Sequence, residues 1–240
     1  MPEAVQADRS LFAYYLVFRR TPAWAALGVA PRRQAVEEAA ERMGMDLGAE
    51  TGEARTSFGP VQVRGVYSVA AFRTDADLML WWVSPAAEAI QELFVQLRRS
   101  RIGQLLEVSR VFLGVHRPAE FNPEHVPAFV RGEAPRRYLC VYPFVRTAEW
   151  YLLEPRRRGE MLKEHGELAR PYPDVLANTT SAFGLGDYEW ILAFETDRLD
   201  RLVDLIRALR AAEARRYVKE ETPFITGVRK SLEAALRDLE

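Results

Sequence analysis

Short apolar runs and longer amphipathic stretches alternate along this chain of 240 residues. Apolar runs of strand length predict strands, and apolar residues spaced three or four apart predict helices. In the first half, the strands are expected near 11–18, 61–72 (broken or continuous) and 106–115, and the helices near 31–43 and 85–99. In the second half, the strands are expected near 137–146, 177–183, 188–195 and 222–227, and the helices near 155–167 and 198–217.

Two sequence echoes indicate that these halves are one repeat. "FRRTPAW" at 18–24 matches "FVRTAEW" at 144–150, and "VAAFRTDAD" near Phe72 matches "ILAFETDRLD" near Phe194. The members of the second pair stop at Thr-Asp, which predicts a helix N-cap. Each half then has the order strand, helix, strand, strand, helix, strand, which is typical of a split βαβ, or ferredoxin-like, unit.

The fold class that follows is α+β, with two antiparallel sheets packed face to face and the helices outside. We expect an N-terminal repeat at 9–115, a proline-rich connecting loop at 116–136 and a C-terminal repeat at 137–240. A loop this long in a compact protein is usually functional.

Composition excludes several classes of protein. Hydrophobic residues make up 48% of the chain, which is enough for a sizeable core. The net charge of −1 provides no general attraction for nucleic acid or an anionic membrane. Cys140 is the single cysteine, so neither an internal disulfide nor a cysteine metal cluster can form. Neither a signal peptide nor a membrane-spanning run is present, which predicts a cytoplasmic protein.

Familiar catalytic motifs are missing from the sequence. There is no P-loop, no dinucleotide fingerprint after a strand, no His-x-x-x-His pair and no nucleophile elbow. The three histidines, His116, His125 and His165, leave a zinc site open, although their spacing is unlike that of structural zinc sites. His116 is expected to be a surface or loop residue.

The stretch "RGEMLKEHGELAR" at 158–170 raises a question about His165. A helix through it places Met161, His165 and Leu168 on one stripe, the stripe that should face the core. A histidine there is either packed and hydrogen-bonded in the core or a ligand of a metal or haem iron. The helix alone does not decide between the two.

The strand before this helix carries a second candidate group. Tyr142, Phe144 and Arg146 alternate onto one face. An arginine among apolar residues is costly unless it meets an anion, which favours a carboxylate ligand over plain packing. Trp150 recurs as Trp24 in the other half, so a structural role and a functional role both remain open for it.

These residues lie in "VYPFVRTAEWYLLEPRRRGEMLKEHGELARPYPDV", and "HRPAEFNPEHVPAF" precedes them. With these segments the chain resembles the chlorite-dismutase-like family, most closely its coproheme decarboxylase branch of actinobacterial type. The resemblance covers almost the whole chain and is strongest from about residue 113 onwards. It implies a pair of ferredoxin-like domains with haem in the C-terminal one, assembled as a homopentamer.

Carried over by position, the resemblance implies a role for each candidate residue. His165 becomes the proximal iron ligand, Tyr142 the tyrosine that forms a radical, and His125 the distal base for peroxide. Residues that would bind the porphyrin are Arg146, Trp150 and Arg215. A carboxylate should orient His165, and Glu213 and Glu189 are both candidates.

The implied activity is the peroxide-dependent decarboxylation of two propionates of Fe-coproporphyrin III (coproheme), giving haem b. The substrate is then also the redox centre. A transient contact with the ferrochelatase that makes the substrate is expected. Chlorite-splitting relatives carry a distal arginine in the segment that matches "VLANTTSAF", whereas Ala177 and Asn178 stand there in this chain. This departure argues against chlorite dismutation; a haem carrier or sensor and a haem-free interaction module remain as alternatives.

Overall fold

The computed structural model describes residues 10–121 and 126–240. The chain forms two compact units. The first consists of Ser10–Val115 together with Ile225–Glu240, and the second of His116–Phe224. The last strand and helix therefore belong with the first unit, whereas the sequence placed everything from 137 to 240 in the C-terminal repeat.

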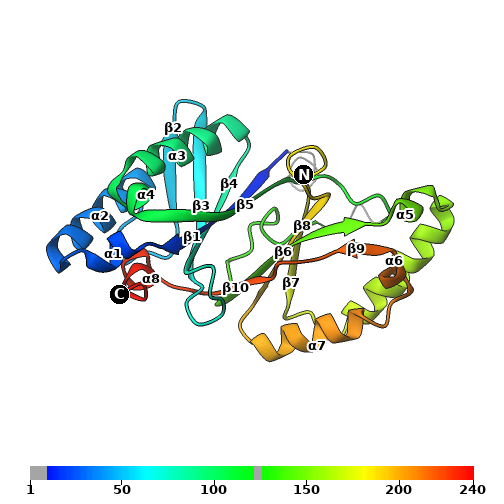
Figure 1. The fold of residues 1–240 in the computed structure, drawn as a ribbon. Coiled ribbons are helices and arrows are strands. Elements are labelled where there is room, and N and C mark those ends of the chain that lie inside the picture. Colours follow the sequence, from blue (N-terminus) through cyan, green and yellow to red (C-terminus); the bar gives the residue numbers. More distant parts are fainter. Residues whose placement is uncertain (1–9, 122–125) are drawn as a thin grey trace. The chain divides into compact units, whose positions relative to one another are not determined.

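The first unit is a ferredoxin-like sheet with helices over one face (Figure 1). Its antiparallel strands follow the order β3-β4-β1-β5, and β2 and β10 pair with β3. The elements are β1 (Phe12–Arg20), α1 (Pro22–Ala26), α2 (Val29–Arg42), β2 (Gly52–Thr56), β3 (Gly59–Ser68), β4 (Leu78–Ser84), α3 (Ala87–Arg99), α4 (Arg101–Leu105), β5 (Leu106–Val115), β10 (Ile225–Arg229) and α8 (Leu232–Arg237).

The core of this unit lies between the sheet and helices α2, α3 and α8. Alternate residues of β1, such as Leu16 and Phe18, meet Trp82 of β4 and Leu93 of α3 in one cluster. Alternation along the strand and helical spacing along α3 bring these side chains to the same layer.

The second unit repeats this topology with the antiparallel order β7-β8-β6-β9 (Figure 1). Its elements are β6 (Tyr138–Arg146), α5 (Ala148–Leu152), α6 (Pro155–Ala169), β7 (Leu176–Ser181), β8 (Trp190–Thr196), α7 (Leu199–Leu209), the 3-10 helix η1 (Glu213–Tyr217) and β9 (Val218–Glu220). Two antiparallel ferredoxin-like sheets with helices confirm the predicted fold class. Helix α6 packs against both α7 and η1.

The first sequence echo corresponds to a repeated local structure. In both units the strand ends at an N-cap threonine, Thr21 or Thr147, and a short helix follows. The tryptophan of that helix, Trp24 or Trp150, is buried in its unit's core. The second echo was misleading, because residues 71–77 form a loop and the equivalent of β8 is β4, which had not been predicted.

The single cysteine, Cys140, is buried in an apolar cluster of the second unit. Among the residues that the structure describes, no helix is long and apolar enough to cross a membrane.

Candidate functional site

His165 lies on α6 and is half-buried, so it is less enclosed than a packed core histidine would be. Of the predicted stripe, only Met161 is fully buried, where it packs with Trp150 and Ala214. His165 and Leu168 are half-buried. The imidazole is therefore on a face that a ligand can reach, and α6 is held in place through Met161, one turn earlier.

Tyr142 lies in the middle of β6, with its side chain 5% exposed. Its ring is stacked between those of Phe194 and Phe224, with centroid distances of 6.0 and 4.2 Å. Burial raises the pKa of Tyr142 well above its usual value. The phenol therefore keeps its proton at any physiological pH.

Arg146 ends the same strand and is half-buried. Its guanidinium stacks on the rings of Trp150 and Phe144, at 4.1 and 4.7 Å from their centroids, and donates to the Ala214 carbonyl at 2.9 Å. Burial lowers the pKa of Arg146 to about 10, while the nearby Glu189 carboxylate acts against that decrease. At neutral pH the group still carries its charge, so it can pair with an anion.

Trp150 is buried beneath that guanidinium and contacts Tyr217 of η1 at 5.8 Å between ring centroids. Its neighbours Met161 and Ala214 come from α6 and η1. Trp150 thus joins the strand of Tyr142, the helix of His165 and η1, and Trp24 fills the equivalent core position in the other unit. A role for Trp150 toward a bound ligand remains a proposal.

Arg215 lies in η1 and forms an ion pair with Glu221 at 2.8 Å. It also lines a hollow of about 350 Å³. The other residues around this hollow are Glu164, Arg210, Ala211, Ala212, Glu213 and Arg216. Glu164 is the neighbour of His165 in the sequence, so this hollow borders the helix that carries the candidate iron ligand.

The two carboxylates considered as partners of His165 have other contacts. The Glu213 carboxylate accepts from Arg157 at 2.6 Å. Glu189 accepts from the backbone N–H of Arg146 at 2.7 Å and from the Tyr151 hydroxyl at 2.6 Å. Both carboxylates are therefore already engaged by other groups.

His125 lies outside the residues that the structure describes. The chain just after it forms a turn at 127–133 that is closed by backbone hydrogen bonds. His116, expected to be a surface or loop residue, lies in the loop that follows β5 but is buried, with 3% of the residue exposed. It continues the alternation of buried positions along β5, after Phe112 and Gly114.

Sequence reasoning missed a buried polar pair that holds this turn. The Asn178 amide accepts from the backbone N–H of Phe129 at 2.9 Å and donates to Glu195 at 3.0 Å. Glu195, fully buried, also accepts from the backbone N–H of Arg136 at 3.1 Å. A polar residue at an alternating, inward position of a strand is the signal that could have revealed the pair.

We expect Asn178→Ala to lower the free energy of unfolding by about 3 kcal/mol, because it leaves a buried N–H without its acceptor and takes a donor from a buried carboxylate. Urea unfolding of the variant would measure this. Thr179→Ala, at the half-buried neighbouring position, is the control and should cost much less. Equal losses for the two variants would contradict the assigned importance of the pair.

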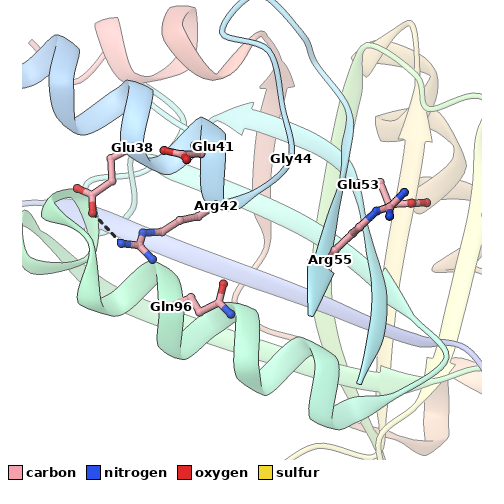
Figure 2. Close-up of a pocket in the computed structure, with 7 residues that line it drawn as sticks. All are labelled: Glu38, Glu41, Arg42, Gly44, Glu53, Arg55 and Gln96. Carbon is pink, nitrogen blue, oxygen red and sulfur yellow. Dashed lines mark hydrogen bonds and ion pairs between the residues drawn. The ribbon is translucent and has the colours of Figure 1, made fainter. Parts of the chain in front are cut away.

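A larger hollow, of about 500 Å³, lies in the first unit between α2, α3 and β2 (Figure 2). Its walls carry charged side chains of both signs, including the Arg42–Glu38 ion pair at 3.0 Å. None of the residues that line it is a candidate from the sequence. Across the described parts of the chain, no three His, Cys, Asp or Glu side chains gather as metal ligands.

Two sequence comparisons identify the family of the chain. The sequence profile of the family described as chlorite dismutase matches residues 30–230. The coproheme decarboxylase of Mycolicibacterium smegmatis is 53% identical over 180 residues, which cover 75% of this chain and 78% of that protein.

Solved structures of chlorite dismutase from Candidatus Nitrospira defluvii share the fold. The complex with imidazole has a TM-score of 0.82 at 22% identity and covers 100% of this chain and 99% of that one. A variant of the same protein in complex with cyanide has a TM-score of 0.82 at 21% identity, with both chains fully covered. The profile match over most of the sequence and the high identity to one member establish that this chain belongs to the chlorite dismutase family.

Proposed function

We propose that the chain is a coproheme decarboxylase, which uses hydrogen peroxide to convert two propionates of Fe-coproporphyrin III to vinyl groups and so forms haem b. The observation that carries this proposal is the 53% identity to the Mycolicibacterium coproheme decarboxylase over three quarters of the chain. At such identity, relatives usually share their reaction as well as their fold.

The side chains of the candidate site in the second unit suit this substrate. A half-buried imidazole on α6 offers an axial ligand for the iron. A buried neutral phenol lies on β6, and Arg146, Arg210 and Arg215 provide cations for carboxylates. The substrate carries more carboxylates than the product, so an arginine-rich site beside the phenol fits the substrate's charge.

In the proposed reaction, each propionate that becomes a vinyl loses carbon dioxide and a pair of electrons, which one peroxide takes up. Bound coproheme supplies the one-electron oxidation chemistry. His165 holds the iron, and His125 moves the proton needed to cleave peroxide. Tyr142 would pass an electron to the oxidised coproheme and release its proton, and the resulting radical would take a hydrogen atom from the β-carbon of the propionate. The β-carbon radical would then give up the second electron as the bond to the carboxyl carbon breaks, carbon dioxide leaves and the vinyl group forms.

The proposal is tested by adding iron coproporphyrin to the purified protein, following the Soret band, adding peroxide and weighing the porphyrin products. Loss of two carboxyl groups with formation of haem b is the expected result. Binding without product would indicate a carrier or sensor, and no binding would indicate a haem-free module. Light scattering of the same sample tests the homopentamer that the resemblance implies.

We expect His125→Ala to bind iron coproporphyrin nearly normally but to react with peroxide about 10²-fold more slowly, the usual scale of general base catalysis. Stopped-flow spectroscopy after mixing with peroxide measures the rate. His116→Ala is the comparison variant, because it removes the other histidine of the connecting segment. If His125→Ala reacted at the wild-type rate, His125 would have no part in the peroxide step.

A further inference from the structure

Three charged side chains form a cluster in the second unit, which we call the carboxylate seat: Arg210, Arg215 and Glu221. Arg210 is the C-cap residue of α7, Arg215 lies in η1, and Glu221 directly follows β9. Arg210 contacts both oxygens of the Glu221 carboxylate, at 2.8 and 2.5 Å, and Arg215 forms an ion pair with one of these oxygens at 2.8 Å. One carboxylate is thus shared by two guanidinium groups.

The seat lies next to Tyr142. Phe224, three residues after Glu221, packs on the Tyr142 ring at 4.2 Å between centroids. The charges of Glu221, Arg210 and Arg215 all act on the pKa of the Tyr142 phenol, although burial raises that pKa more than Glu221 does. The two arginines also line the hollow of about 350 Å³ beside α6.

The exposure of these groups shows which of them is enclosed. The Glu221 side chain is 14% exposed, whereas Arg210 and Arg215 are 40% and 39% exposed. A carboxylate enclosed by two arginines loses most of its hydration, and pairing with these cations compensates for that loss. The arginines face solvent and the hollow, from which another carboxylate can approach them.

We propose that Glu221 determines specificity by occupying, in the ligand-free protein, the position that a substrate propionate takes between Arg210 and Arg215. The incoming propionate displaces Glu221 and is held beside Tyr142. Once that propionate has become an uncharged vinyl group, Glu221 returns to the arginines. This inference rests on the proposed function only for the identity of the ligand, a porphyrin propionate.

The exchange has a measurable consequence for binding. In the wild type, the arginines are paired both with substrate bound and with product bound, because Glu221 replaces the lost propionate. In Glu221→Gln the amide is a much weaker partner for two cations, so the arginines are well paired only when a ligand carboxylate is present. The variant should therefore favour the carboxylate-rich porphyrin over the product-like one more strongly than the wild type does.

The probes are metal-free coproporphyrin III and protoporphyrin IX, which differ in the propionates that the reaction removes and do not depend on iron ligation by His165. Their dissociation constants for the full-length protein are measured by fluorescence. In Glu221→Gln, the ratio of the protoporphyrin to the coproporphyrin constant should rise about tenfold, the scale of one charge-assisted hydrogen bond. In Arg210→Gln, which removes one of the two arginines of the seat, the same ratio should fall by a similar factor.

Asp174→Asn is the matched control. Asp174 is also a carboxylate held by an arginine of α7, with its two oxygens 2.8 and 2.9 Å from the Arg201 guanidinium. It is outside the seat, so the ratio should stay at the wild-type value. Circular dichroism of each variant checks that the second unit is folded.

An unchanged ratio in folded Glu221→Gln, or an equal change in Asp174→Asn, would overturn the proposal. If Glu221→Gln does not fold, Arg210→Gln is the deciding variant, because the Arg210 side chain is partly exposed and its replacement should be tolerated. An unchanged ratio of dissociation constants in Arg210→Gln would also overturn the proposal. Peroxide turnover of iron coproporphyrin by the wild type tests the proposed function separately. If the wild type showed no turnover but the variants gave the expected ratios of dissociation constants, the proposal for Glu221 would stand and the proposed decarboxylation would be wrong.

Discussion

His165→Ala is expected to abolish the axial bond to the iron and most of the decarboxylation, while the protein stays folded. The side chain is half-buried, and α6 is anchored through Met161 instead. Truncation should therefore lower the free energy of unfolding by only about 1 kcal/mol. The Soret band of the variant with iron coproporphyrin, and the product masses after peroxide, provide the measurement.

Leu168→Ala is the control for this variant, because Leu168 is half-buried on the same stripe of α6 but offers no ligand atom. It should keep the wild-type spectrum and product. Free imidazole added to His165→Ala should restore part of the spectrum by occupying the vacated position. If the spectrum of His165→Ala equalled that of the wild type, His165 would be a packing residue after all.

Periodicity predicted the architecture because each unit's outer layers are amphipathic. Helix α3 shows clear spacing, since its buried residues lie three or four apart on the face that meets the core. Strand β1 was predicted from its apolar run alone, and six consecutive residues of it are buried. The repeated Phe-x-Arg-Thr-x-x-Trp segments marked the same strand end and short helix in both units. The internal repeat therefore identifies equivalent positions in the two units from this one sequence.

Strand β4, "LMLWWVS", is buried at all seven positions, and it escaped prediction because the misleading second echo placed the strand of this region at 61–72. It pairs with β1 on one side and β3 on the other, so its apolar run shows no alternation. Such a run has the period of neither a strand nor a surface helix. The polar strand β2 was missed because its five residues include a single buried side chain, Ala54.

Two further differences arise from tertiary structure. The stretch predicted as one helix over 198–217 ends at Leu209 and resumes as η1, although its residues favour a continuous helix. The break brings Arg210 and Arg215 to the same carboxylate, Glu221, which a straight helix could not do. The final strand pairs with β3 of the first unit, a partner that local patterns cannot identify.

For the candidate site, residue spacing on β6 and α6 was informative because regular elements fix which side chains share a face. Partners that reach across elements were not predictable, and they include Glu221, Glu195 and the Ala214 carbonyl. Arg146 shows that the free-energy cost of burying an arginine does not by itself identify its partner. It had been expected to need an anion, yet aromatic stacking and a backbone carbonyl already accommodate much of its charge.

Tyr142→Phe separates an enzyme from a haem-binding protein, and we expect it to bind iron coproporphyrin nearly as the wild type does. The variant keeps the ring stacked between Phe194 and Phe224 and removes one hydroxyl. The free energy of unfolding should therefore change by about 1 kcal/mol, the size of one hydrogen bond. Thermal unfolding and the Soret titration measure these two quantities.

Without the phenol, nothing at this position can pass a hydrogen atom from the propionate, so both propionates should persist after peroxide is added. Tyr172→Phe is the matched control, because Tyr172 packs against the same apolar cluster but its ring lies under Arg201. It should produce haem b at the wild-type rate. Mass spectrometry of the porphyrin after a fixed time compares the two variants. Haem b formed by Tyr142→Phe at the wild-type rate would reject the radical role of Tyr142, whereas loss of product in that variant alone would locate the hydrogen transfer at its hydroxyl.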